Sequence, residues 1–441
     1  MIKIDGKYCK DVKIFTDNVE EEAIGQIQSI ANNKAFEGQK IRIMPDVHAG
    51  KGITIGFCST LGDYVNPCHV GVDIGCMMST VEYDKPIPVD KYEDFNHKVL
   101  TRIGFGHDVS PIKAYSDRDL YDYLTASCRR AKSAHPGLFY SLPDKVDQAW
   151  ITGLCKRLRI GEKVFYASIN SAGSGNHFIE YGEGVDSDGN PRYAVTVHCG
   201  SRNFGLRVCN YWEGMANAGL PKKEQKELTK EYKEHYLDTH DSMENFGQDL
   251  KAYLNTKKPC SIDGYLEGEM MHGYLSDMVI AVAYAEFNHK VIHDTIDKIV
   301  AVYGLRPVDY YDTKHNYIDF NCPVPIIRKG AIRSYDGERM IVPFNMRDGI
   351  AICEGKSNED WLCSCSHGAG RKMSRTKAKD TLSLDEFKDT MKGVYSTTVD
   401  EFTLDEAPMA YKDTEEIKEL IKDTCDVRYM LIPKINIKSN K

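Results

Sequence analysis

A basic segment near the C-terminus, SHGAGRKMSR at residues 366–375, contains the residue types that phosphate chemistry requires. His367 is followed by a turn of small residues and then by Arg371, Lys372 and Arg375. Glycines let backbone N–H groups approach an anion closely, basic side chains neutralise its charge, and an imidazole can contact or attack phosphorus. The alternative is a basic surface turn with an ordinary histidine, because short glycine-rich motifs recur by chance.

Five further side chains are of types that bind metal ions. Asp73 and Cys76 are three residues apart in GVDIGCMM, so they can present a carboxylate and a thiolate to one metal or to two adjacent ones. His177, His198 and His315 each lie in or beside a strand-like segment, and neutral imidazole is the commonest metal ligand. Taken alone, the Asp-Cys pair favours a structural role over metal binding, because cysteine is often a core residue.

Together these donors exceed what one tetrahedral zinc ion requires, and they suit a two-metal centre with open positions. The mixed oxygen, nitrogen and sulfur set does not select a particular metal. Two adjacent ions could clamp a triphosphate and neutralise charge while its α-phosphorus is attacked. In that arrangement His367 is the natural nucleophile.

The segment MPDVHAGKG, at residues 44–52, places Asp46 and His48 at alternate positions, so on a strand both point to one face. This pattern favours an acid, base or substrate-orienting role for Asp46. His48 can equally hold a neighbouring loop. Basic residues that lie beside glycine turns, and whose side chains suit phosphate contacts, are Arg202, Arg328, Lys329 and Arg333.

Several kinds of element must position these residues. The first fifteen residues alternate apolar and polar like a strand, and residues 40–57 and 66–83 indicate short strands broken by Gly and Pro. Residues 116–134 repeat apolar positions at helical spacing. Residues 193–205 predict a strand that ends in a basic glycine turn.

The second half begins with helices and ends with strands. Residues 222–240 predict a solvated helix, and residues 276–303 predict a long buried one. Strand-like segments follow at 308–320 and 324–344, and the last, LIPKINIK, is at 431–438. Two short helices are expected after the His367 loop, one with Ser383 and Glu386 at capping-box spacing and one at 414–422. Because the chemical residues are scattered, a single intertwined α+β domain fits best.

Composition is that of a globular protein without membrane spans. The 441 residues are 41% hydrophobic and 28% charged, and no apolar run approaches the ~20 residues that a span needs. No signal peptide is evident, so we expect a cytoplasmic protein whose fourteen scattered cysteines are reduced and mostly buried. The net charge of -8, from 57 basic and 65 acidic residues, argues against nonspecific nucleic-acid coating but permits a local basic groove.

The ordered motifs resemble those of one family, the RtcB-type RNA-splicing ligases, over roughly residues 40–438. These motifs are MPDVHAGKG, GVDIGC, GSGNHF, HCGSR, DTKHN, RKGA, SHGAGRKMSR and DEAPMAYKD. Members of that family join an RNA 2′,3′-cyclic phosphate or 3′-phosphate end to a 5′-hydroxyl end, using GTP and two Mn(II) ions. The resemblance implies one α+β domain over residues 1–441, with mixed and antiparallel sheets around a central metal site and a charged helical insertion at about 206–275.

The resemblance also implies roles for single residues. His367 would form a phosphoramidate with GMP and release pyrophosphate, and Asp46 would act in the last steps of joining. The implied manganese ligands are Asp73, Cys76, His177, His198 and His315, with Cys76 bridging the two ions. The implied nucleotide contacts are Asn176, Asn345, Gly368, Ala369, Gly370, Arg371, Tyr411 and Lys438. The implied RNA contacts are Arg202, Arg328, Lys329 and Arg333.

Departures from the family pattern leave other outcomes open. Residues 344–349 read FNMRDG where many relatives have Gly-Ser-Met-Gly, so part of the nucleotide wall is altered. Asn288-His289 replaces an expected Asn-Arg pair, and Ile327 replaces a histidine. The alternatives are an enzyme that caps 3′-phosphate ends or hydrolyses cyclic phosphates without efficient joining, and an inactive metal-stabilised RNA-binding protein. The expected partner is RNA, the expected state is a monomer, and an accessory activator is compatible with the family.

Overall fold

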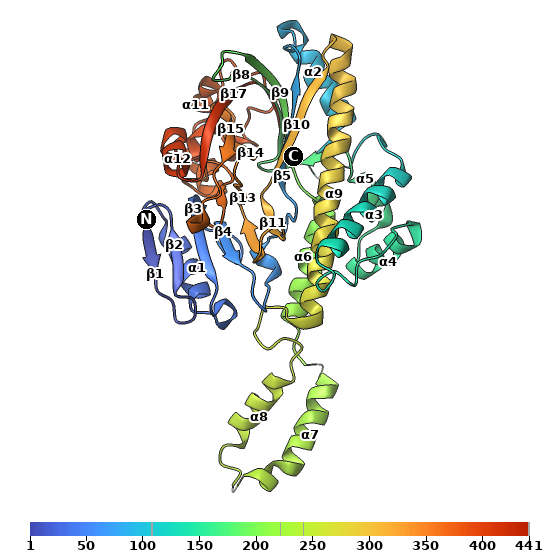
Figure 1. Cartoon of the computed structure of the whole chain (residues 1–441), viewed down its shortest axis with the longest axis vertical. Helices are drawn as coiled ribbons and strands as arrows, with labels where there is room; N and C mark the ends of the chain where they lie inside the picture. Colours follow the sequence, from blue (N-terminus) through green and yellow to red (C-terminus); the bar gives the residue numbers. More distant parts are fainter. Residues whose placement is uncertain (107–108, 221, 241, 440–441) are drawn as a thin grey trace.

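The computed structural model describes residues 1–106, 109–220, 222–240 and 242–439. In these residues the chain forms a single α+β domain, which confirms the predicted fold class. It contains two large sheets, and a long helix runs beside one of them (Figure 1). Among the described residues, no helix combines the length and the apolar character that crossing a membrane requires.

The first sheet has six strands in the order β1-β2-β3-β4-β12-β11. Its strands are β1 (Ile2–Ile4), β2 (Asp11–Ile14), β3 (Lys40–His48), β4 (Ile55–Thr60), β11 (Asn316–Asp319) and β12 (Ile326–Lys329). Strands β2 and β3 are parallel, so the chain must cross over between them, and α1 (Glu21–Ala31) makes this crossover. Helix α1 buries Ala23, Ile27 and Ile30, which share one face because they are three or four residues apart.

The second sheet has seven strands in the order β10-β5-β9-β8-β17-β15-β14, and every pairing is antiparallel. Its strands are β5 (Met77–Tyr83), β8 (Phe178–Val185), β9 (Pro191–Cys199), β10 (Pro307–Lys314), β14 (Arg339–Asn345), β15 (Gly349–Gly355) and β17 (Cys425–Ile437). Strand β5 is buried along its whole length, as expected for a strand covered on both faces. The C-terminal strand β17 joins the two halves of this sheet.

Helix α9 (Gly268–Val300) is the central helix of the helical layer and contains most of the predicted segment 276–303. It is apolar on nearly all sides, because it packs against the seven-stranded sheet and against other helices. These are α2 (Tyr92–Arg102), α3 (Asp117–Ala134) and α6 (Arg202–Ala216). Helix α3 matches the predicted segment 116–134 and begins with a capping box made by Ser116 and Asp119.

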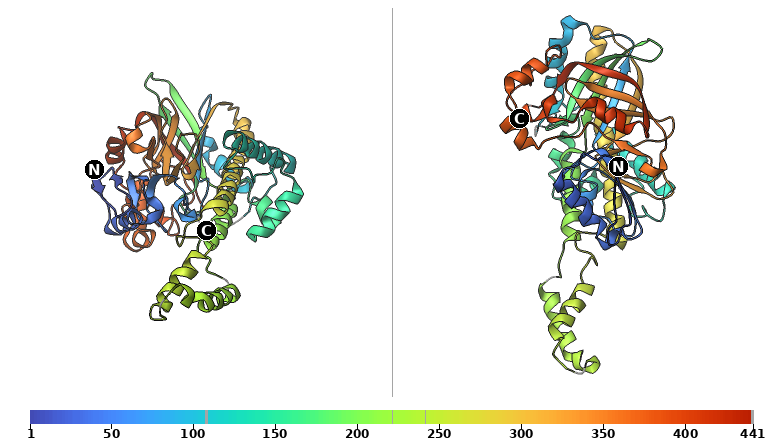
Figure 2. Two further views of the ribbon diagram at one scale, coloured as in Figure 1. Left: turned by 60° about the horizontal axis from the view of Figure 1, so that its bottom comes forward. Right: turned by 90° about the vertical axis from the view of Figure 1, so that its left-hand side faces the viewer.

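A pair of helices projects from the body of the molecule, at the bottom of Figure 1 and in both views of Figure 2. They are α7 (Lys222–Thr239), which was predicted, and α8 (Phe246–Thr256). Tyr232 stacks on Tyr253 with ring centroids 4.3 Å apart, which holds the two helices together. The predicted insertion at 206–275 is broader than this projection, because most of α6 and the start of α9 pack in the body. Residues 221 and 241 lie outside the described residues.

Shorter elements complete the fold. They are the turn η2 (Pro67–His69), the helices α4 (Gln148–Leu158), α5 (Glu162–Ala167), α10 (Arg375–Thr381), α11 (Leu384–Thr390) and α12 (Thr414–Ile421), and the strands β6 (Gly104–Phe105), β7 (Ser171–Gly173), β13 (Ala331–Arg333) and β16 (Ser364–Ser366). Ser383 caps α11 by accepting a hydrogen bond from the Glu386 N–H, as predicted. Two α-helices were expected after the His367 loop, and α10 is a third. All fourteen cysteines are unpaired and twelve are buried.

Candidate active site

One cavity of about 680 Å³ collects most of the residues that the sequence singled out. The predicted metal donors that line it are Asp73, Cys76, His177, His198 and His315. The predicted nucleotide residues that line it are Asn176, Asn345, Gly368, Ala369, Gly370, Arg371, Tyr411 and Lys438. His367 also lines the cavity, so residues more than 350 positions apart in sequence share one site.

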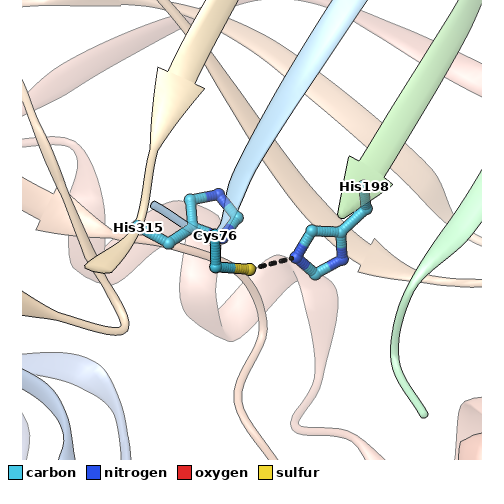
Figure 3. Close-up of side chains that lie close together, drawn as sticks. All are labelled: Cys76, His198 and His315. Atoms are coloured by element: carbon cyan, nitrogen blue, oxygen red, sulfur yellow. Dashed lines mark hydrogen bonds between the residues drawn. The ribbon is translucent and has the colours of Figure 1, made fainter. Parts of the chain in front are cut away.

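Strand register brings the first two donors together. Cys76 immediately precedes β5, whose Met77 pairs with Cys199 on β9. His198 is the neighbour of Cys199 on β9, so Cys76 and His198 emerge side by side at the same end of the sheet. The Cys76 Sγ and the His198 Nε2 are 3.2 Å apart (Figure 3).

The neighbouring strands add two more donors. Phe178 of β8 pairs with His198, so His177, which precedes it, lies at the same end. Lys314 ends β10, which pairs with β5 on the other side, and His315 follows it directly. Figure 3 shows His315 and His198 on either side of the cysteine, and their ring centroids are 5.2 Å apart.

Asp73 is supplied by the turn before β5. Its carbonyl accepts the Cys76 N–H at 3.1 Å, and its Oδ2 lies 3.0 Å from the His177 Nε2. Gly200, just after β9, packs against this carboxylate so closely that a Cβ at that position would overlap it. Only glycine therefore leaves Asp73 its place in the cluster.

The imidazoles are oriented as metal ligands usually are. The Nδ1 of His177 lies 3.0 Å from the Ala172 carbonyl, and the Nδ1 of His198 lies 3.1 Å from the Asn176 carbonyl. Each of these carbonyls leaves the Nε2 facing the cluster, which is the outer support that ligating histidines receive. Both ring nitrogens of His315 are buried without a hydrogen-bond partner among the described residues.

The donor atoms divide into two groups that could each hold an ion. One comprises Cys76, His198 and His315, and the other comprises Asp73, Cys76 and His177. Within each group the ligand atoms lie within 4.8 Å of one another, and the Cys76 thiol is common to both. A shared sulfur and unpartnered imidazole nitrogens fit a two-metal centre.

The electrostatics of the cluster also suit a cation. Burial lowers the pKa of His198 and of His315 well below the usual value, so both imidazoles are neutral and can act as ligands. Burial, together with the Asp73 carboxylate, raises the pKa of the Cys76 thiol well above its usual value. A bound cation would reverse that shift, because a coordinating thiol is deprotonated.

His367 faces the metal donors from the opposite wall. It follows β16, and its ring centroid lies 5.2 Å from that of His315. Its Nδ1 is 2.7 Å from the Oδ2 of Asp46, and its backbone N–H donates to the same oxygen at 3.1 Å. Asp46, on β3, is fully buried. Gly370 adopts a φ of +71° and packs against the Asp46 backbone, where a Cβ would overlap the carbonyl oxygen.

A buried carboxylate organises the far end of the cavity. Glu406 accepts a hydrogen bond from the Tyr411 hydroxyl at 2.7 Å and pairs with Lys438 at 3.3 Å and with Arg371 at 3.5 Å. It also contacts Arg375. Burial acts to raise the pKa of Glu406, but the surrounding cations and the Tyr411 hydroxyl outweigh it and lower this pKa to about 2. The carboxylate is therefore ionised at neutral pH.

Sequence reasoning missed Glu406 as a site residue. It lies within the quoted motif DEAPMAYKD, from which only Tyr411 was selected, and it lines the cavity. The available signal for Glu406 was an acidic residue among apolar ones, in a motif that also supplies the predicted Tyr411. Its partner Lys438 follows in sequence only after 31 further residues, so the ion pair itself was not visible.

Two predicted nucleotide residues have other contacts as well. The Asn176 side chain is exposed at the cavity wall, while its carbonyl supports His198. Asn345 closes the turn between β14 and β15, because its Oδ1 accepts the N–H groups of Arg347 and Asp348 and its Nδ2 donates to the Asp348 carboxylate. The altered segment 344–349 is therefore a tight hairpin turn at the cavity edge.

The four predicted RNA contacts do not line the cavity. Arg328 is fully buried, and its guanidinium pairs with Asp319 at 2.7 Å and donates to the Ser364 hydroxyl and two carbonyls. The Lys329 Nζ is buried and donates to three backbone carbonyls. Both side chains are buried and all of their donors are engaged within the fold. Contact of these two residues with RNA stays a prediction.

The other two basic residues are partly buried. Arg202 begins α6 and donates to the Ser171 hydroxyl at 3.1 Å and to the Gly106 carbonyl at 2.8 Å. Arg333 pairs with Glu338 at its Nε. Both side chains hold neighbouring segments and keep partial exposure, and their contact with RNA stays a prediction.

Comparisons with known proteins agree with this geometry. The sequence profile described as tRNA-splicing ligase RtcB matches residues 26–439. The chain is 29% identical over 445 residues to the RNA-splicing ligase RtcB of Escherichia coli K12, and 28% identical over 443 residues to the RNA-splicing ligase RtcB1 of another Escherichia coli strain. Both alignments cover 95% of each chain.

An archaeal relative is more distant. The tRNA-splicing ligase RtcB of Archaeoglobus fulgidus is 25% identical over 467 residues, covering 91% of this chain and 88% of the relative. The profile spans the seven-stranded sheet, all strands of the six-stranded sheet except β1 and β2, the metal donors and the His367 loop, which confirms the resemblance inferred from the motifs. The chain therefore belongs to the RtcB family.

Proposed function

We propose that this protein is an RNA ligase that joins an RNA 2′,3′-cyclic phosphate or 3′-phosphate end to a 5′-hydroxyl end, using GTP. The observation that carries the proposal is the position of His367, which Asp46 holds at 2.7 Å in the same cavity as five metal donors. The relatives named as RNA-splicing ligases support the reaction class.

His367 is the proposed nucleophile. With its Nδ1–H donated to Asp46, the Nε2 carries the lone pair and is available for attack. The Nε2 attacks the α-phosphorus of GTP, a P–N bond forms, and the bond from that phosphorus to the bridging oxygen breaks. Pyrophosphate leaves with the electron pair, and the Asp46 carboxylate stabilises the positive charge that develops on the imidazole.

The opposite wall would hold divalent cations, for which the resemblance implies two Mn(II) ions. Its ligands would be Asp73, Cys76, His177, His198 and His315. When bound, such ions neutralise phosphate oxygens and act as Lewis acids. Four of the five donor side chains are buried and Asp73 is partly exposed, so the protein limits the access of water to this wall.

The RNA 3′-phosphate is the proposed acceptor of GMP. After hydrolysis of any cyclic phosphate, a 3′-phosphate oxygen attacks the histidine-bound phosphorus, the P–N bond breaks and His367 is regenerated. The 5′-hydroxyl oxygen then attacks the RNA phosphorus, GMP leaves, and a 3′–5′ diester forms. Asp46 is the proposed proton acceptor in this step, since its Oδ1 has no hydrogen-bond partner among the described residues.

The Glu406 end of the cavity is the proposed nucleotide-base pocket. An ionised carboxylate accepts only, so it suits the adjacent N–H donors of guanine. Tyr411 and Lys438, which contact Glu406, would complete the base contacts, while Arg371 and the turn at residues 368–370 would face the phosphates. Lys51, an exposed residue at the cavity wall, is a proposed RNA-phosphate contact.

The decisive test is capture of the nucleotide on the histidine. The protein is incubated with Mn(II) and each of the four labelled nucleoside triphosphates, and a covalent adduct is measured after denaturation. We expect an acid-labile, hydroxylamine-sensitive GMP adduct that His367→Ala abolishes. His97→Ala, on the exposed side of α2, is the matched control and should retain it.

Addition of RNA with 3′-phosphate and 5′-hydroxyl ends separates the proposal from its alternatives. Joined product supports ligation. Accumulation of RNA that ends in GMP, without joining, would instead assign the capping activity, and absence of an adduct with every metal and nucleotide would reject the proposed mechanism.

A further inference from the structure

A second cluster of metal-binding side chains lies outside the cavity. Cys68 comes from η2, and Cys209 and Glu213 come from α6, one helical turn apart. One ligand atom of each lies within 4.8 Å of the other two. None of the three lines the active-site cavity.

An unpartnered hydroxyl lies near this cluster. Tyr274, on α9, is fully buried, and its hydroxyl has no hydrogen-bond partner within the residues that the structure describes. Burial, together with the nearby Cys209 and Cys68 thiols, raises its pKa well above the usual value. A buried phenol without a partner is costly unless a water or an ion completes the site.

We propose that Cys68, Cys209 and Glu213 bind a thiophilic divalent cation of the zinc class, with a water that hydrogen-bonds to the Tyr274 hydroxyl in the fourth position. Tetrahedral zinc with Zn–S bonds of about 2.3 Å separates neighbouring ligand atoms by roughly 3.8 Å, which the spacing of these side chains accommodates.

Charge balance favours a divalent cation. Two thiolates and one carboxylate carry three negative charges, so a divalent ion leaves a single negative charge. The Lys51 Nζ lies 3.7 Å from the Glu213 carboxylate, and the buried Lys329 Nζ donates to the Cys68 carbonyl at 2.9 Å. These two ammonium groups offset the remaining charge.

A disulfide between Cys68 and Cys209 would account for fewer of these side chains than a bound metal ion does. It would use neither the Glu213 carboxylate, which lies with the thiols, nor the unpartnered Tyr274 hydroxyl, which lies near them. A carboxylate beside two thiols is a familiar zinc donor set, since Asp and Glu oxygens join Cys sulfur in such sites. The metal therefore accounts for four side chains where a disulfide accounts for two.

The ion would clamp two segments that lead into the active site. Residue 68 lies shortly before Asp73 and Cys76, and α6 begins shortly after His198. The Cys68 side chain also packs against the glycine at 52, in the loop whose carbonyls at 51 and 53 accept from Lys329. Bridging η2 to α6 would hold this loop and the metal-donor turn in place, whatever reaction the cavity performs.

Cobalt binding to the full-length protein tests the proposal, because thiolate ligands give Co(II) an intense near-ultraviolet charge-transfer band. Cys76→Ala removes the thiolate of the active site, so any remaining band reports a second thiolate site. We expect Cys76→Ala to bind Co(II) with such a band and to release Co(II) on addition of Zn(II). Adding Cys68→Ser and Cys209→Ser should abolish the band.

Two further variants keep the result interpretable. Cys260→Ser is the matched control, because Cys260 is also buried and contacts the far end of α6, and it should retain the band. Glu213→Gln changes a partly exposed side chain without threatening the core, and it should weaken Co(II) binding at least about tenfold. Circular dichroism checks the fold of every variant.

Several outcomes would overturn the site. They are absence of a band in folded Cys76→Ala, a band that survives loss of both cysteines, an unchanged affinity in Glu213→Gln, and a Cys68–Cys209 disulfide detected by mass spectrometry in protein kept under reductant. The adduct assay on His367 is read separately, so failure of this site and failure of the proposed ligation are distinguishable.

Discussion

The two ends of the active-site cavity are built in different ways. The metal-donor end takes its side chains from the ends of hydrogen-bonded strands, β5, β8, β9 and β10, whose register sets their spacing. The nucleotide end takes Arg371 and Tyr411 from loops, Glu406 from the short 3-10 helix η6 (Leu404–Glu406) and Lys438 from just beyond β17. Arg371, Tyr411 and Lys438 are held by ion pairs and a hydrogen bond to the buried Glu406 carboxylate.

This difference has a physical consequence. Backbone register positions the metal donors even when one of them is replaced, so a substitution there removes a ligand and leaves the sheet intact. At the nucleotide end the charges themselves hold the geometry, so removing Glu406 leaves the buried Lys438 ammonium without its carboxylate partner and disturbs the wall. Loss of function without loss of stability is therefore expected at one end, and loss of both at the other.

The largest effect on activity is expected at the shared sulfur. Cys76→Ala removes the donor common to both groups, so metal binding should fall more than about 100-fold, and ligation should be lost with it. The free energy of unfolding of the metal-free protein should change little beyond the loss of a small buried side chain, about 1 kcal/mol. Metal titration by calorimetry and urea unfolding measure the two quantities, and a collapsed fold would break the proposed contrast.

The next largest effect on activity is expected at the Asp46–His367 pair, which lies between the two ends of the cavity. Asp46→Asn preserves the shape of the side chain but no longer favours the tautomer in which the His367 Nδ1 carries the proton. By analogy with a triad carboxylate, adduct formation should slow by about 10²–10⁴-fold. Single-turnover adduct kinetics measure this rate, and a change below about threefold would show that Asp46 does not orient the histidine.

Glu406→Gln should affect stability and nucleotide binding together. The pKa of about 2 lies below the value of about 4.3 for an unfolded glutamate, so ionised Glu406 stabilises the fold fully above pH 4.3. That contribution is lost as the pH falls toward 2. The variant should be less stable at pH 7 by about 3 kcal/mol, and its stability should fall less steeply below pH 4.3.

Measuring nucleotide affinity distinguishes a contact between Glu406 and the base from a purely structural role of Glu406. GTP affinity of Glu406→Gln, followed by equilibrium dialysis, should drop about tenfold, as expected for one lost charge-assisted hydrogen bond to the base. Unchanged affinity together with lowered stability would mean that Glu406 only holds the wall.

The smallest effect is expected at the projecting helices. α7 and α8 pack mainly on each other, and none of their residues lines the cavity. Replacing residues 222–256 with a short Gly-Ser linker should therefore leave adduct formation within about twofold of the parent protein. A larger decrease in adduct formation would show that the projecting helices contribute to the chemistry of the cavity, in addition to its two ends.

Several helices could be predicted from local sequence patterns. Helical periodicity predicted α3, α7 and most of α9, and Ser383 with Glu386 predicted the start of α11, because these signals arise within a few turns of the chain. The predicted insertion at 206–275 was broader than the projection, although the sequences of the two helices differ. Helix α6 has an apolar face and buries six residues in the body, whereas the charged helix α7 buries only Tyr236 among its described residues.

The sequence indicated which side chains could bind metal or attack phosphorus, but it did not indicate which residues they contact. The metal donors and His367 stand out because buried-looking histidines, a cysteine and an aspartate beside glycines have few structural uses, and motif order pointed to the RtcB family that the profile match establishes. Basic residues carried no such constraint. Arg328 and Lys329 have the same sequence signature as phosphate-binding residues, yet burial engages both of them inside the fold.

Residue identity thus decided which atoms are available for chemistry, because ligand and nucleophile types are properties of single side chains. Folding decided which of them meet. Strand register joins Cys76 to His198, a buried ion pair joins Glu406 to Lys438, and η2 meets α6 to assemble the Cys68 site. Such contacts depend on burial and long-range packing, which no local spacing encodes.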